Sequence, residues 1–197
     1  MNGLKKIVGN DIMAPKIEDL NAILDRINQW IVNCDNKSMI LVTLMGIIVG
    51  ILFATSYIGK LLNIYSYICL HLTFFNLFYL MISIFSISLI LVGIWYIIQS
   101  FVAKTEIPTE EGLITNSLIY YSTISDYEYG DYVKNVKCLD EESLKQEIIS
   151  QIYINSKICT KKFENYNKGL KFSIWGFSLF AVSMVIGWGL CKLVWGI

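Results

Sequence analysis

Tyrosine and lysine side chains gather in the second half of the sequence in a pattern that could hold a flat, phosphorylated ligand. The set comprises Tyr120, Tyr121, Tyr127, Tyr129 and Tyr132, followed by Lys157, Lys161 and Lys162. Aromatic faces can stack on a nucleobase, and lysine ammonium groups can neutralise a phosphate. The same tyrosines could instead fill a small protein core, with the lysines near anionic lipid headgroups. Composition alone leaves both interpretations open.

Residue sets for catalysis or metal binding are missing from the sequence. The single histidine, His71, has no acid or second histidine nearby in sequence, so it gives no Ser/His/acid triad. No glycine-rich phosphate loop or dinucleotide fingerprint is present. The acids Asp126, Glu128 and Asp131 lack the glycine and terminal Glu of a calcium loop. We therefore expect a protein that is not an enzyme and has no catalytic residue, metal or cofactor.

The composition indicates a membrane protein. Apolar residues make up 55% of the 197 residues and charged residues only 16%, against roughly 25% charged in soluble domains. Residues 61–103 contain no Asp, Glu, Lys or Arg, and neither do residues 172–191. A net charge of zero argues against a nucleic-acid partner. We predict an all-α integral membrane protein with about three transmembrane helices and a small cytosolic helical region.

Hydrophobic periodicity predicts where the elements lie. Residues 20–31 have apolar positions three and four apart, which is typical of an amphipathic helix. A charged break at 34–37 is expected before a first span over 38–58, which is about 30 Å long as a helix. The tyrosine-containing stretch 63–73 is interpreted as an outer interfacial segment, before one tilted span over 74–101.

The last predicted helix begins with acids in its first turn, as the helix dipole favours, at Asp140, Glu141 and Glu142. No proline follows Glu141, and Gly169 is the one glycine before the last span. This helix is therefore predicted to continue into the final span as a single long rod. Such a rod would couple the cytosolic part mechanically to the membrane.

Small residues recur every four positions in the first predicted span, at Gly46, Gly50 and Ala54. Such a face lets another helix backbone approach closely, so we predict a helix-packing role for these three residues.

Lysine and arginine positions near the spans predict the orientation. Arg26, Lys37 and Lys104 lie on one side with the lysines at 161–171, whereas Lys60 lies on the other. The positive-inside rule then places the amino terminus and residues 104–171 in the cytoplasm and the carboxyl terminus outside. The expected segments are 1–37, a cytosolic amphipathic helix; 38–103, transmembrane helices 1 and 2 with the interfacial segment; 104–171, the cytosolic tyrosine-rich segment and long helix; and 172–197, transmembrane helix 3.

Three blocks occur in a fixed order relative to these spans. They are residues 27–38 with Trp30, Asp35 and Lys37; residues 119–132 with Tyr121, Ser122 and Tyr132; and residues 151–163 with Lys157, Lys161 and Lys162. Together these blocks resemble the membrane-spanning effectors of Pycsar, the pyrimidine cyclase system for antiphage resistance. Ser122 stands where that family usually has Gly.

The resemblance implies a multi-pass protein of the bacterial plasma (inner) membrane, with the lipid bilayer and a partner cyclase as its context. It would sense a cyclic pyrimidine mononucleotide, cyclic CMP or cyclic UMP, and impair membrane integrity, causing growth arrest or cell death. A homo-oligomer is expected, since one three-helix chain cannot enclose a pore. The expected ligand-binding residues are Tyr121, Ser122, Tyr132, Lys157, Lys161 and Lys162, and Trp30, Asp35 and Lys37 would be structural or gating residues.

The competing interpretation is a constitutive small membrane scaffold, or a transporter accessory subunit, with no nucleotide ligand. The two differ in one observable property. Only the effector would change membrane permeability when a cyclic nucleotide is made.

Overall fold

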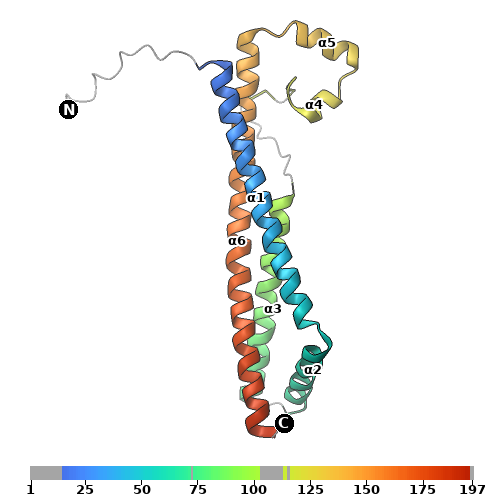
Figure 1. Ribbon diagram of the computed structural model, residues 1–197, viewed down its shortest axis with the longest axis vertical. Coiled ribbons are helices and arrows are strands. Elements are labelled where there is room, and N and C mark those ends of the chain that lie inside the picture. The colour runs from blue at the N-terminus through green and yellow to red at the C-terminus, as the bar shows by residue number, and fades with distance from the viewer. Residues whose placement is uncertain (1–14, 72, 103–112, 115, 196–197) are drawn as a thin grey trace, which may run out of the picture. The chain divides into compact units, whose positions relative to one another are not determined.

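The computed structural model describes residues 15–71, 73–102, 113–114 and 116–195 (Figure 1). Every regular element within these residues is a helix. The helices are α1 (Ile17–Leu52), α2 (Thr55–Leu70), α3 (Phe74–Phe101), α4 (Tyr121–Ser125), α5 (Tyr129–Lys137) and α6 (Glu141–Trp195). Three of them, α1, α3 and α6, are long and apolar enough to cross a membrane. The chain is an all-α membrane protein, as its composition predicted.

Two compact units make up the chain. The tyrosine-rich unit comprises Met1–Gln29 and Glu106–Lys157, and the apolar unit comprises Trp30–Thr105 and Ile158–Ile197. Both α1 and α6 contribute residues to each unit. The units change at residues 29/30 and 157/158, whereas the predicted membrane topology divides the chain at 37/38 and 171/172. That topological division stays a prediction.

Helix α1 corrects the predicted break at residues 34–37. It runs from Ile17 to Leu52 without interruption, so the amphipathic helix predicted over 20–31 and the first predicted span belong to one helix. Asp, Asn and Lys cost only tenths of a kcal/mol in a helix, which is too little to end one. The charge of Asp35 is moreover paired with Lys162 from another helix.

The end of α1 corrects the predicted packing face. Helix α1 ends at Leu52 and α2 begins at Thr55, with Ala54 as the N-cap of α2 in an extended conformation. Ala54 therefore does not continue the face formed by Gly46 and Gly50. A Cβ atom added at either glycine would meet nothing within 4 Å among the described residues, so their predicted packing role stays a prediction. The interfacial stretch predicted over 63–73 is largely helical and belongs to α2.

Two other helices agree with the sequence. Helix α3 covers Phe74–Phe101, the predicted second span. Helix α6 is a single helix of 55 residues, as the lack of proline predicted. At its start the Ser143 amide donates to Asp140 Oδ1 at 2.8 Å, which is an N-cap hydrogen bond.

Small residues form the seam where α3 packs on α6 in the apolar unit (Figure 1). Buried positions of α3 are three, four or seven residues apart, and they include Ser83, Ser86, Gly93 and Ser100. A Cβ added at Gly93 would lie 2.9 Å from the Ser173 amide nitrogen, and one at Gly176 would lie 2.8 Å from the Ile90 amide nitrogen. The two backbones are therefore in near contact, as in small-residue packing of membrane helices.

The helices of this seam are antiparallel. Gly93 of α3 meets Gly169 and Ser173, whereas Tyr79, near the start of α3, meets Gly187. Two buried serines along the seam donate within their own helix, whereas the Ser83 hydroxyl has no hydrogen-bond partner among the described residues. Ser173 Oγ donates to the Gly169 carbonyl at 2.7 Å, and Ser86 Oγ donates to the Ser83 carbonyl at 2.8 Å. A small side chain with an internally bonded hydroxyl packs almost as an apolar one.

The tyrosine-rich unit is held by polar side chains that bind backbone groups. Buried Glu147 of α6 accepts the Leu118 amide at 2.8 Å and the Ser117 hydroxyl at 3.0 Å. Ser150, one turn later, accepts the Ile114 amide at 3.2 Å. These bonds fix the segment that leads into α4 along one side of α6. In the same unit, Asn155 of α6 donates to Asn28 of α1 at 2.9 Å.

Candidate functional site

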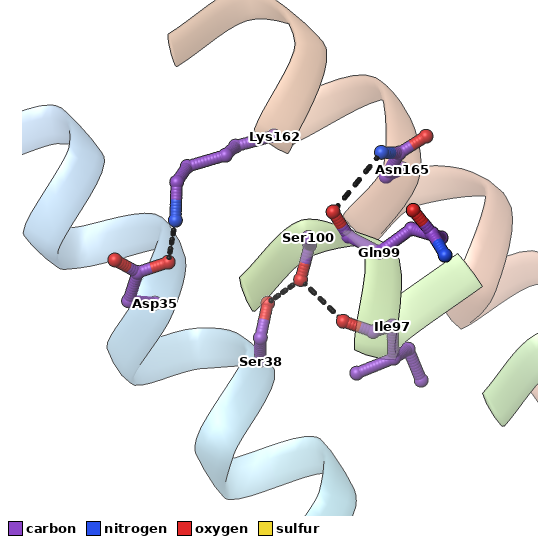
Figure 2. Close-up of polar contacts among 7 residues, drawn as sticks. All are labelled: Asp35, Ser38, Ile97, Gln99, Ser100, Lys162 and Asn165. Atoms are coloured by element: carbon purple, nitrogen blue, oxygen red, sulfur yellow. Dashed lines mark hydrogen bonds and ion pairs between the residues drawn. The ribbon is translucent and has the colours of Figure 1, made fainter. Parts of the chain in front are cut away.

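A buried ion pair joins α1 to α6 in the apolar unit. Lys162 Nζ lies 2.6 Å from Asp35 Oδ1, and the lysine side chain is only 8% exposed against 33% for the aspartate (Figure 2). Removing charges from water is costly, and this geometry recovers the cost only while both partners are present. Loss of either partner would leave the other charge poorly solvated. The pair is thus the strongest polar constraint between these two helices.

Further hydrogen bonds lie about one helical turn from this pair and form with it a polar layer, which we define as Asp35, Ser38, Gln99, Ser100, Lys162 and Asn165. Ser100 Oγ donates to the Ile97 carbonyl at 2.7 Å, so the proton in the 2.8 Å contact between Ser38 and Ser100 comes from Ser38. Asn165 Nδ2 donates to the Gln99 carbonyl at 3.3 Å. As Figure 2 shows, the layer links α1, α3 and α6. Satisfied polar groups among helices favour one packing arrangement over its alternatives.

The structure places the three predicted gating residues around this layer. Asp35 pairs with Lys162 and not with Lys37. Lys37 lies over the Phe163 ring, 5.8 Å from its centroid, in a cation–π arrangement. Trp30 is half exposed and lines an open groove of about 480 Å³ with Cys159, Thr160, Phe163, Glu164 and Asn167. Whether these residues take part in gating stays a prediction.

The predicted ligand-binding residues divide between the two units. Tyr121, Ser122, Tyr132 and Lys157 belong to the tyrosine-rich unit, and Lys161 and Lys162 belong to the apolar unit. Their role in binding a nucleotide stays a prediction.

Tyr121 and Tyr132 have different surroundings within the tyrosine-rich unit. Tyr121 begins α4 and is 72% exposed, with its ring 4.8 Å from that of Tyr120. Burial of Tyr120 and its hydrogen bond to Tyr121 raise the pKa of the Tyr120 hydroxyl. The Tyr132 hydroxyl donates to the Leu118 carbonyl at 3.1 Å, which ties α5 to the segment before α4. Tyr121 is thus available at the surface, whereas Tyr132 is fixed.

The remaining predicted ligand residues already have protein neighbours. Ser122 is exposed, and its carbonyl accepts the Ser125 hydroxyl at 2.6 Å. Lys157 lies over the Tyr153 ring at 5.1 Å, and Lys161 lies 3.9 Å from Glu164. Lys162 is committed to Asp35. A phosphate that recruited Lys162 would have to displace this aspartate.

A cavity of about 200 Å³ lies within the tyrosine-rich unit, which we call the Asp126 cavity. It is lined by Asn116, Thr123, Asp126 and Tyr127. The Tyr127 ring packs against that of Tyr132, 6.2 Å away between centroids. The Thr123 hydroxyl is held by the carbonyls of Ser117 and Tyr120. Of the residues singled out in the sequence, Tyr127 thus lines the cavity and Tyr132 contacts Tyr127, while Tyr121 and Ser122 are not among the lining residues.

Sequence reasoning missed several residues of both sites. Glu147 and Ser150 position the tyrosine-rich segment, and Ser100 and Asn165 complete the polar layer. The signal that could have found Glu147 is its place on the apolar stripe of α6, directly before buried Ile148. A carboxylate on a stripe that packs against other residues needs a partner.

Comparison with known proteins identifies the class that this fold and these sites define. A sequence model for the Pycsar effector protein domain, PycTM, matches residues 19–188, which span α1 through most of α6. The chain therefore belongs to the Pycsar effector family of antiphage defence proteins.

A curated relative agrees with this assignment. The chain is 29% identical over 167 residues to Pycsar effector protein GmPycTM from Gulbenkiania mobilis, and the match covers 80% of this chain and 85% of that protein. No solved structure matches the chain. Family membership and the three span-capable helices together make it a membrane-located antiphage effector.

Proposed function

We propose that this effector senses a cyclic pyrimidine mononucleotide made by a partner cyclase and then impairs the integrity of the plasma membrane. The observation that carries the proposal is the family match over residues 19–188, which includes described parts of both units. Because the match is this long, the tyrosine-rich unit and the span-capable helices belong to one family domain. The expected result in the cell is growth arrest or death.

A nucleotide can change the protein only by binding one arrangement more tightly than another. A shift from about 1% to about 99% active requires roughly 5.5 kcal/mol of differential affinity. Each hydrogen bond of the kind that holds the tyrosine-rich unit contributes about 1 kcal/mol. A ligand that gained several such bonds in only one arrangement could therefore supply a difference of this size. In the apolar unit, the polar layer favours one packing arrangement of α1, α3 and α6.

The signal must reach the tyrosine-rich unit from the cytoplasm. The positive-inside rule, applied to Arg26, Lys37 and the lysines at 161–171, supports a cytoplasmic amino terminus and cytoplasmic residues 104–171. The carboxyl terminus then lies outside. Cysteine labelling of Cys138, which is exposed in the structure, tests this orientation in intact cells. Labelling by an impermeant reagent before lysis would contradict it.

Membrane damage of this kind calls for more than one copy, since a bundle of three helices has no lumen of its own. Gly46 and Gly50 of α1 supply a face at which an added Cβ would meet none of the described residues within 4 Å. Small residues spaced by four positions let a second helix approach closely. This face supports a homo-oligomer, whose size crosslinking in the membrane would give.

The decisive experiment measures dye entry into bacterial cells that express the effector with or without a cyclase. We expect propidium to enter only when cyclic CMP or cyclic UMP is produced. Tyr121→Ala should abolish this response while the protein still inserts into the membrane. Tyr129→Ala is the matched control, because Tyr129 is also highly exposed but lies on α5. Dye entry that is independent of both nucleotides would favour a constitutive scaffold and would overturn the proposal.

A further inference from the structure

The polar groups of the Asp126 cavity are unevenly balanced between donors and acceptors. Asp126 presents a carboxylate that can only accept, and no ion pair or hydrogen bond engages it within the described residues. The Thr123 proton is committed to backbone carbonyls of Ser117 and Tyr120, so its hydroxyl can offer only lone pairs to a ligand. Asn116 can both donate and accept. The cavity therefore favours a ligand edge that carries a donor.

This balance also decides which end of a nucleotide the cavity can accept. Among the described residues its lining includes no Lys, Arg or His, and the Asp126 carboxylate would repel a phosphate. A volume of about 200 Å³ is smaller than the 300–1,000 Å³ typical of whole small-ligand sites. An uncharged ring fits these limits better than a complete nucleotide does. The phosphate would then remain outside the cavity.

An aromatic wall suits a flat ring. Tyr127 is one of the lining residues, and its ring lies 6.2 Å from that of Tyr132 between centroids. Tyr132 is itself held by its 3.1 Å hydrogen bond to the Leu118 carbonyl. Tyr127 therefore packs against a side chain that is fixed in place. Stacking on such a ring is tolerant of base identity, so the polar groups must supply any selectivity.

We propose that the Asp126 cavity is the base subsite of this effector and that it selects cytosine over uracil; the inference rests on the proposed function. Cytosine carries an exocyclic amine at C4, which donates to a carboxylate. Uracil carries a carbonyl oxygen at the same place, which would face the Asp126 carboxylate as a second acceptor. The cognate ligand is accordingly cyclic CMP, with the C4 amine directed to Asp126 and Asn116 available to the remaining ring edge.

The test is a calorimetric titration of the full-length protein in lipid nanodiscs with cyclic CMP and, separately, cyclic UMP. A good base-specific contact discriminates by about 5- to 150-fold. Because Asp126 is exposed, we expect the low part of this range, roughly tenfold tighter binding of cyclic CMP. Asp126→Asn replaces one acceptor oxygen by a donor amide, and its preference should fall to near parity. Glu128→Gln, which removes an exposed neighbouring acid outside the lining, should keep the wild-type preference.

The possible outcomes separate this inference from the proposed function. Equal binding of the two nucleotides, or tighter binding of cyclic UMP, overturns cytosine selection and leaves nucleotide sensing intact. If the Asp126→Asn variant keeps the full preference for cyclic CMP, other residues supply the selectivity and the cavity is not the base subsite. Binding of neither nucleotide by the wild-type protein overturns the subsite and the proposed function together.

Discussion

The two units of the molecule differ in the kind of contact that stabilises each of them internally. In the apolar unit, α3 and α6 approach so closely at Gly93 and Gly176 that a single added Cβ would meet backbone atoms. In the tyrosine-rich unit, Glu147 and Ser150 reach out to bind the backbone of the segment before α4. The first kind of contact tolerates almost no change of side chain, whereas the second kind depends on a few hydrogen bonds. The contrast supports the proposal that a ligand acts on the tyrosine-rich unit.

The largest effect is expected from breaking the ion pair of the apolar unit. Lys162→Met should lower the free energy of unfolding by about 2–3 kcal/mol, somewhat less than a fully buried pair because Asp35 is 33% exposed. The double variant Asp35→Asn/Lys162→Met should recover at least about 1 kcal/mol of this loss, because it removes the unpaired charge as well. Unfolding in mixed detergent micelles measures both. A double variant less stable than the single one would argue against the charge-pair account.

A smaller cost is expected from a methyl group inserted into the seam. Gly176→Ala brings a Cβ to 2.8 Å from the Ile90 amide nitrogen and 3.1 Å from the Ser86 carbonyl, and backbone atoms cannot move aside as side chains do. We expect a loss of about 2 kcal/mol. Gly59→Ala on α2 is the matched control, since its Cβ meets nothing within 4 Å and helix propensity favours Ala. Equal stabilities for the two variants would contradict the close approach of α3 and α6.

The tyrosine-rich unit should lose its local order when Glu147 is removed. Glu147→Ala leaves the Leu118 amide and the Ser117 hydroxyl without their acceptor, at a cost of about 1–2 kcal/mol. Hydrogen exchange should accelerate at residues 117–120 and remain unchanged within α3. Gln146→Ala, an exposed neighbour on α6, serves as the control. Uniform acceleration across both units would mean that Glu147 supports the whole fold.

The smallest effect concerns the first turn of α6 and depends on pH. Hydrogen bonds from the Ser143 side chain and amide hold the pKa of the Asp140 carboxyl below its ordinary value of 3.8. Because the folded-state pKa is depressed, the cap stabilises the helix above the ordinary value and is lost as pH falls through the lowered one. The protection factor of the Ser143 amide, which corrects for the intrinsic pH dependence of exchange, should therefore fall on acidification. Asp140→Asn keeps a good cap residue and should show no such pH dependence.

Much of the helix plan was predictable because it follows from hydrophobic periodicity and helix-ending residues. The bounds of α3 and the unbroken course of α6 were correctly predicted from uncharged runs and the lack of proline. The break predicted at residues 34–37 was wrong, since charged residues cost too little in a helix to end it. The partner of Asp35 is Lys162, which is 127 positions away in the sequence, so local pattern could not reveal it.

The candidate sites were predicted as residue types but not as arrangements. The block containing Trp30, Asp35 and Lys37 and the one containing Lys162 were each singled out, yet the pairing of Asp35 with Lys162 emerged only from the packing of α1 on α6. The packing role assigned to Gly46 and Gly50 stays a prediction, since none of the described residues packs against them, while the glycines of the α3–α6 seam were overlooked. Buried positions along this seam alternate steps of three and four residues. The seam glycines therefore do not form a motif that repeats at every fourth residue.

The seam between α3 and α6 also has a practical consequence for purification. Its cohesion comes from dispersion contacts between closely apposed backbones and does not depend on exclusion of water. Detergent chains resemble lipid tails in polarity, so separating these two surfaces in detergent releases little free energy. Extraction with a mild, long-chain detergent should therefore deliver this pair of helices intact, and ligand titrations on solubilised material should report on the native bundle.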